Sequence, residues 1–244
     1  MSFMYGGLIM FEYDFMVQYV DINTSGVLSD YGLLKYLQEI ACLHADSKKY
    51  GLKDTPVNRL AWIILDWRIE FISRPNWNTK LHIKTWASKI DNISCYRDFE
   101  VTSESGERLA LASSRWVLLN IDTHHISKIT PEIKSAFEPI CSSVFTTETN
   151  KLTEPDSYES CFEYTILKRD IDTNQHLNNL NYIMLAKEAL PEANEFSKID
   201  VMYKHQCLLS DKVLFLCHKE DCGYVVAVKN ADTGVLHAII SFAL

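Results

Sequence analysis

The chain has 244 residues, a length that fits one large domain or two small ones. Hydrophobic residues make up 47% of it and charged residues 23%, the composition of an ordinary globular protein. The formal net charge of −8 argues against nonspecific binding to nucleic acids or to anionic membranes, so we expect neither as a partner.

The first half of the chain predicts a strand, a helix and then a run of antiparallel strands. The first strand covers 11–19, and a polar turn leads from it into a helix whose apolar residues recur at helical spacing between Leu33 and Ala45. Runs rich in β-branched and aromatic residues predict further strands at 61–72, 80–90, 94–103 and 108–120. One long helix against an antiparallel sheet is a two-layer α+β domain.

The second half repeats this order of elements. A strand at 162–167 precedes a helix that Pro191 ends, and the last strands are predicted at 198–207, 212–219, 224–230 and 235–244. Matching hairpin turns are marked by Ser105-Gly106 and Thr233-Gly234. Between the halves, 135–157 is rich in Ser, Thr, Glu and Pro and predicts a linker. We therefore predict an N-terminal domain at 1–134 and a C-terminal domain at 158–244.

The two halves also share sequence around their helices. Residues 21–39 align with residues 170–188 without a gap, at an offset of 149. The identical pairs are Asp21/Asp170, Ile22/Ile171, Thr24/Thr173, Leu28/Leu177 and Glu39/Glu188. These identities are weak alone, but the matched order of elements around them supports a duplicated fold. In this order the chain is similar to a double hotdog, in which each of two sheets wraps around a central helix.

The two copies differ where chemistry is expected. At three alternate positions the first copy has Asn23, Ser25 and Val27, and the second has Asp172, Asn174 and His176. A carboxylate can hold an imidazole in one tautomer, and the imidazole can move a proton near neutral pH. An amide can donate to a carbonyl oxygen or orient a water. These groups could hydrolyse an activated acyl group, but Asp and Asn before a helix are also common N-caps, so spacing alone leaves both interpretations open.

The segment from Asp172 to Tyr182 resembles the signature of the acyl-ACP thioesterases, Asp-x-Asn-x-His followed by a hydrophobic residue and Asn-Asn. Further segments that resemble this family are 37–44, Trp62, 74–77, 85–86, 112–117 and 127–131. The resemblance implies hydrolysis of a fatty acyl thioester on acyl carrier protein, which releases free fatty acid and ends elongation. It implies Asp172, Asn174 and His176 as catalytic residues. Without a transit peptide, the bacterial branch of the family fits best.

One position departs from the plant members of this family. Residues 203–207 fall where those members have Tyr-Arg-Arg-Glu-Cys, and the Glu position holds Gln206. A carboxamide can place a water or a substrate but cannot accept a proton as a base. Either Asp172 or His176 must then activate water, or Cys207 must act as a nucleophile and form an acyl-enzyme. We favour water, because a buried cysteine at the end of a strand is more often inert.

The first copy lacks these polar groups, and the resemblance suggests that the N-terminal domain lines a pocket for the acyl chain. The residues expected to line it are Leu37, Ile40, Ala41, Trp62 and Trp86. For each of them alone, ordinary core packing is the simpler interpretation. The preferred chain length cannot be derived from these residues.

The seven cysteines are odd in number and irregularly spaced, which favours reduced thiols in a cytoplasmic protein. No signal peptide is recognised at the N-terminus, and no metal or cofactor is implied. A homodimer is left open, because hotdog domains commonly pair through their sheets. Two other functions also stay open: a hydroxyacyl-ACP dehydratase and a non-catalytic or altered acyl-thioester-binding hotdog protein.

Overall fold

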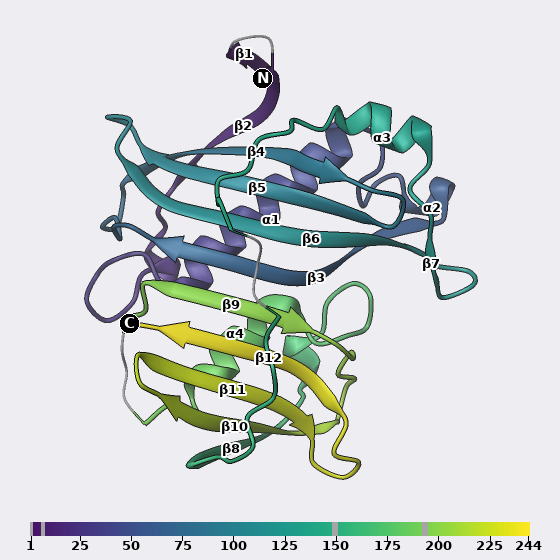
Figure 1. Ribbon diagram of the computed structural model, residues 1–244. Coiled ribbons are helices and arrows are strands. Elements are labelled where there is room, and N and C mark those ends of the chain that lie inside the picture. Colours follow the sequence, from purple (N-terminus) through teal and green to yellow (C-terminus); the bar gives the residue numbers. More distant parts are fainter. Residues whose placement is uncertain (1, 6–7, 148–150, 192–194) are drawn as a thin grey trace. The chain divides into compact units, whose positions relative to one another are not determined.

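A computed structural model describes residues 2–5, 8–147, 151–191 and 195–244. The chain divides into two compact units, one of Met1–Leu65 and Ile69–Glu148 and one of Asp66–Arg68 and Thr149–Leu244. Each unit combines a helix with an antiparallel sheet, as the sequence predicts (Figure 1). The predicted domain boundaries and the roles assigned to the domains stay predictions.

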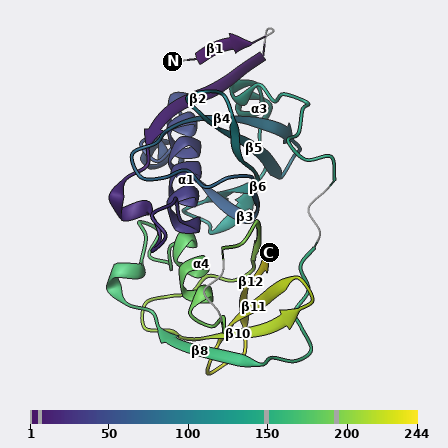
Figure 2. The same ribbon diagram turned by 90° about the vertical axis from the view of Figure 1, so that its left-hand side faces the viewer.

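The first unit is built on a sheet with the strand order β1-β2-β4-β5-β6-β3. These strands are β1 (Ser2–Tyr5), β2 (Leu8–Met16), β3 (Leu60–Phe71), β4 (Lys80–Ile90), β5 (Ser94–Ser103) and β6 (Arg108–Asn120), and β7 (His125–Ser127) pairs with β6. Helix α1 (Asp30–Ser47) lies against one face of the sheet (Figure 2). The apolar residues whose spacing predicts this helix are buried. Shorter elements that the sequence analysis did not predict are η1 (Tyr19–Asp21), α2 (Thr55–Asn58) and α3 (Pro131–Phe137).

The second unit has the strand order β9-β12-β11-β10-β8 and the helix α4 (Asn179–Lys187). Its strands are β8 (Ser160–Thr165), β9 (Lys198–Tyr203), β10 (Lys212–Glu220), β11 (Gly223–Asn230) and β12 (Leu236–Ala243), and η2 (Lys168–Asp170) precedes α4. The strand predicted at 198–207 was wrong at its end, because β9 stops at Tyr203. There the N–H groups of Lys204 and His205 both donate to the carbonyl of His237, at 2.8 and 3.2 Å, which ends the regular ladder. In the described parts of the chain, no helix is long and apolar enough to cross a membrane.

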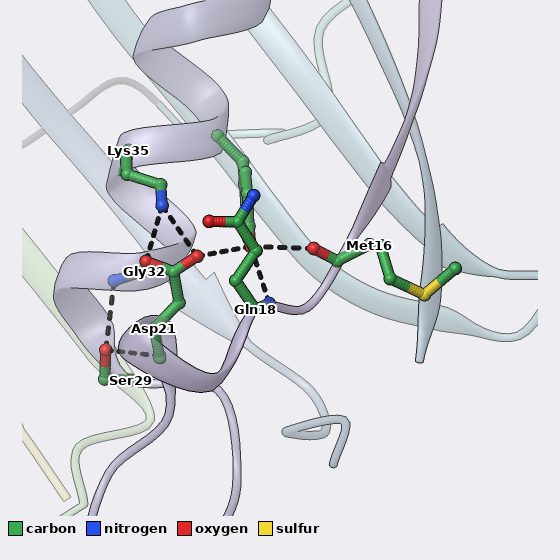
Figure 3. Close-up of polar contacts among 7 residues, drawn as sticks. Met16, Gln18, Asp21, Ser29, Gly32 and Lys35 are labelled. Carbon is green, nitrogen blue, oxygen red and sulfur yellow. Dashed lines mark hydrogen bonds and ion pairs between the residues drawn. The ribbon is translucent and has the colours of Figure 1, made fainter. Parts of the chain in front are cut away.

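A buried polar cluster fixes the start of α1 in the first unit (Figure 3). The carboxylate of Asp21 is 1% exposed and accepts hydrogen bonds from Lys35 Nζ at 2.6 Å and from the Tyr36 hydroxyl at 2.5 Å. The same hydroxyl lies 2.9 Å from the carbonyl of Met16 and accepts a hydrogen bond from the N–H of Gln18. The Tyr36 side chain therefore joins α1 to the segment that follows β2.

We expect Tyr36→Phe to lower the free energy of unfolding by about 1–3 kcal/mol, because it removes the hydroxyl that donates to the buried Asp21 carboxylate and accepts from the N–H of Gln18. Urea denaturation would measure this loss. The control is Tyr13→Phe, since Tyr13 is 47% exposed on β2 and its hydroxyl can bond to water. Equal stability of the two variants would show that the Tyr36 hydroxyl adds nothing to the cluster.

Candidate active site

The segment 172–176 forms a closed turn before α4. Oδ1 of Asp172 accepts hydrogen bonds from the N–H groups of Asn174 and His176, at 2.8 and 3.3 Å. The N–H of Asp172 donates to the carbonyl of His176 at 2.8 Å, and Gln175 takes a positive φ of 64°. The turn therefore holds the three residues of the motif on one short, fixed piece of backbone.

The first copy forms the same turn without the motif. Oδ1 of Asn23 accepts hydrogen bonds from the N–H groups of Ser25 and Val27, at 2.9 and 3.3 Å. The N–H of Asn23 donates to the carbonyl of Val27 at 2.8 Å, and Gly26 has a φ of 81°. An asparagine is thus sufficient to close this turn, so the turn itself does not require the negative charge of Asp172.

The N-terminus of α4 is capped by a residue outside the motif. The N-cap of α4 is Asn178, whose Oδ1 accepts a hydrogen bond from the N–H of Leu180 at 3.0 Å. In the first unit, Ser29 caps α1 through the N–H of Gly32. Capping therefore does not account for Asp172, Asn174 and His176.

In the part of the chain that the structure describes, the side chains of the motif are not joined by hydrogen bonds. Within the described residues, no hydrogen bond joins the carboxylate of Asp172 to the ring of His176. Asn174 is exposed, while Asp172 and His176 are partly exposed. Their accessibility allows contact with a substrate, and catalytic hydrogen bonds often form only when the substrate binds.

The loop after β9 contacts the motif through Cys207. The carbonyl of Cys207 accepts a hydrogen bond from the N–H of Leu177 at 2.9 Å, next to His176, and its N–H donates to the hydroxyl of Tyr182 at 3.2 Å. Cys207 is fully buried, and burial raises the pKa of its thiol to about 12. The thiol is therefore protonated at neutral pH, which argues against a role as nucleophile in this state.

The first unit shows which of its residues corresponds to Gln206. The carbonyl of Pro75 accepts a hydrogen bond from the N–H of Leu28 at 2.8 Å, as Cys207 does from Leu177, so the preceding residues Arg74 and Gln206 are equivalent. The sequence alone does not reveal this correspondence, because the two loops lie at a different offset from that of the aligned helices.

In the first unit, the residue at the position equivalent to Gln206 forms an ion pair. Arg74 donates to the Asp30 carboxylate at 2.6 Å and to the carbonyl of Leu28 at 3.0 Å. The Asp30 side chain is buried, and the Arg74 side chain is 9% exposed. In the second unit Asn179 stands at the position of Asp30, and Gln206 is exposed. The second copy therefore replaces this ion pair by uncharged side chains, one of them accessible to solvent.

The residues predicted for an acyl-chain pocket all lie in the first unit. Leu37, Ile40 and Ala41 are buried on α1, Trp86 is buried on β4, and Trp62 is partly buried on β3. The indole N–H of Trp86 donates to the carbonyl of Ser142, within the segment predicted as a linker. These contacts are those of a packed core, so the pocket stays a prediction.

The described residues contain no group of three His, Cys, Asp or Glu side chains that could hold a metal ion. All seven cysteines are free thiols. The motif contributes a carboxylate, an amide and an imidazole, and Gln206 contributes a further amide.

Comparisons with known proteins place both units in one family. The family model for the acyl-ACP thioesterase N-terminal domain matches residues 9–137, and that for the acyl-ACP thioesterase C-terminal domain matches residues 153–242. The chain is 26% identical over 84% of its length to the oleoyl-acyl carrier protein thioesterase 1 of Arabidopsis thaliana, of which it spans 62%. It is 29% identical over 82% of its length to the palmitoyl-acyl carrier protein thioesterase of Gossypium hirsutum, of which it spans 52%.

Solved structures confirm the fold. An acyl-ACP thioesterase from Bacteroides thetaiotaomicron matches with a TM-score of 0.85 at 20% identity, over 96% of this chain and 97% of the other. The 12:0-ACP thioesterase from Umbellularia californica matches with a TM-score of 0.82 at 20% identity, over 96% of each chain. The predicted α+β double hotdog fold is therefore confirmed.

Proposed function

Because family matches at 9–137 and 153–242 place the chain in the acyl-ACP thioesterase family, we propose that it hydrolyses fatty acyl-ACP to free fatty acid and ACP. The observation that carries this proposal is the turn at 172–176, which presents Asp172, Asn174 and His176 on a backbone that the first copy uses without them. The reaction would end fatty acid elongation in the cytoplasm, with acyl carrier protein as partner. A homodimer remains part of the proposal.

In the proposed mechanism a water molecule attacks the thioester carbonyl. His176 or Asp172 takes the proton from the water, and Asn174 donates a hydrogen bond to the oxygen on which negative charge develops. The carbon–sulfur bond then breaks, and the sulfur leaves as the thiol of the carrier's arm after it regains a proton. Gln206 helps to place the water, and the N-terminal domain holds the acyl chain.

The proposal is tested with a panel of acyl-ACPs and hydroxyacyl-ACPs. We expect release of free thiol from acyl-ACP, followed with a thiol reagent after separation from the enzyme. Formation of an enoyl product from hydroxyacyl-ACP would instead indicate a dehydratase. Stable binding without turnover would indicate a non-catalytic acyl-thioester-binding protein, and either result would contradict the proposed function.

Cys207→Ala is expected to keep turnover within about threefold of wild type, because a thiol with so high a pKa supplies almost no thiolate at neutral pH. Steady-state kinetics on acyl-ACP would measure it. A loss of activity without a loss of stability would support the acyl-enzyme route instead. In that route the rate should also rise with pH towards the pKa of the thiol, since the thiolate forms only above it.

We expect Gln206→Glu to raise kcat by about tenfold, because it adds a proton acceptor where the amide can only place the water. The gain should be present above the pKa of the new carboxyl and lost as the pH falls through it, because the protonated acid cannot act as a base. A pH–rate profile of both proteins would measure this. Gln206→Ala is the control, since it removes the amide and adds no base.

A further inference from the structure

His237 lies at the start of β12, beside the segment that leads to Gln206. β9 and β12 run side by side as far as the pair Tyr203 and Ala238 (Figure 1). Beyond this pair, the N–H groups of Lys204 and His205 both donate to the carbonyl of His237. The backbone of His237 is therefore the point at which the segment 204–207 leaves the sheet.

The imidazole of His237 adds a third contact to the same segment. Its Nδ1 lies 3.1 Å from the carbonyl oxygen of His205, and because a carbonyl only accepts, Nδ1 must carry the proton and donate it. The residue is 4% exposed, and burial lowers the pKa of the ring, so the imidazole is neutral at neutral pH. Nε2 is buried and has no hydrogen-bond partner among the described residues. The imidazole is therefore in the tautomer with the proton on Nδ1, and this N–H donates to the carbonyl of His205.

The other end of the segment is fixed at the motif. Cys207 accepts a hydrogen bond from the N–H of Leu177 and donates one to Tyr182. Gln206 is therefore placed between two anchored neighbours, His205 on the side of β12 and Cys207 on the side of the motif turn. A shift of either anchor would move the side chain of Gln206 relative to the motif.

The first unit has the backbone contacts but not the imidazole. The N–H groups of Ile72 and Ser73 donate to the carbonyl of Leu109, at 2.9 and 3.0 Å, so Leu109 is the equivalent of His237. The side chain of Leu109 is buried and apolar. The second copy, which carries the motif, therefore has a side-chain hydrogen-bond donor where the first copy has an apolar side chain.

We infer that His237 is a positioning residue of the proposed active site, which holds the carbonyl of His205 and so sets where Gln206 presents its amide. This inference rests on the proposed function for its effect on catalysis. The contact itself can be tested without turnover.

The kinetic test replaces His237 by the residue of the first copy. We expect His237→Leu to lower kcat about tenfold to a hundredfold, because a small displacement of the Gln206 amide would move the attacking water away from its productive position. KM should stay within about twofold of wild type. His237→Asn should keep most of the activity, because its amide can donate where Nδ1 does. The control is His218→Leu, which removes a partly exposed histidine on β10 whose Nδ1 lies 3.2 Å from the carboxylate of Glu159.

A double-mutant cycle tests whether His237 acts through Gln206. In a Gln206→Ala background, His237→Leu should lower kcat little further, because the effects of substitutions at two coupled residues are not additive. A full additional loss in that background would overturn the inference, as would wild-type kcat in His237→Leu.

Two readouts do not need activity. Nitrogen NMR of the imidazole should show the proton on Nδ1, and alkylation of Cys207, followed by mass spectrometry, should be faster in His237→Leu than in wild type or His237→Asn. A proton on Nε2, or an unchanged rate of alkylation, would overturn the inference. If these readouts hold in a protein that hydrolyses no acyl-ACP, the proposed function fails and the contact stands.

Discussion

Replacement of His176 by valine is expected to lower kcat on acyl-ACP by about a hundredfold or more, because it removes the imidazole that can take the proton from the attacking water, or from Cys207 in the acyl-enzyme route. Valine is the residue of choice, since Val27 occupies the equivalent place in the first copy and is compatible with the same turn. We therefore expect the fold and the melting temperature to change little. Thiol release and thermal unfolding, measured on the same preparation, would test both expectations.

The matched control for this variant is His218→Val, on β10 and outside the motif. It should leave kcat unchanged. If His176→Val retains the turnover of the wild type while it is folded, His176 is no acid or base of the reaction, the prediction is wrong, and Asp172 is left as the base of the motif.

Replacement of Asp172 distinguishes its role in closing the turn from its proposed role in catalysis. Asp172→Asn keeps the oxygen that accepts from Asn174 and His176, as Asn23 does in the first copy, but it removes the negative charge. We expect kcat to fall about a hundredfold with stability unchanged, because the amide cannot take a proton or stabilise a charged imidazole. Asp172→Ala should lower activity equally and also cost about 0.5–1.5 kcal/mol of stability, since two backbone N–H groups lose their side-chain acceptor.

Denaturation in urea together with steady-state kinetics would measure both variants. Asn23→Asp is the control for charge, because it places a carboxylate in the same turn of the first unit, away from the motif in sequence. It should leave kcat unchanged. Wild-type kcat in Asp172→Asn would show that Asp172 serves only the turn, and it would assign the base to His176.

The sequence predicts most of the fold because the local signals are strong. The strands predicted at 80–90, 94–103 and 108–120 agree with β4, β5 and β6 at every boundary, since the pattern of β-branched and aromatic residues is bounded by polar turns. Helix α3 was not predicted, although Thr130 and Pro131 form its N-cap and first position. It has seven residues, about two turns, which is too short for a periodic pattern to be recognised. Phe137, at its end, is buried within the segment predicted as a linker, because composition does not reveal one anchoring side chain.

The location of the candidate site was predictable, but its contacts were not. Comparison of the two halves identified Asp172, Asn174 and His176 as the differing positions. That the Asp172 carboxylate bonds to backbone N–H groups depends on the turn conformation. The pairing of His205 with His237 depends on β12 lying next to β9, and residues so distant in sequence carry no signal of that adjacency. These contacts follow from tertiary structure alone.

The shared turn has a consequence for how such a site arises. Asn23 and Asp172 close the same loop with hydrogen bonds of nearly the same length, although only the second loop carries an imidazole. A backbone conformation suited to reactive groups is thus present in both halves, and the halves differ there only in their side chains. Exchanges of side chains on this turn are therefore sufficient to place or remove an imidazole without a change of fold. For the same reason the first half is a ready acceptor for a second, engineered motif.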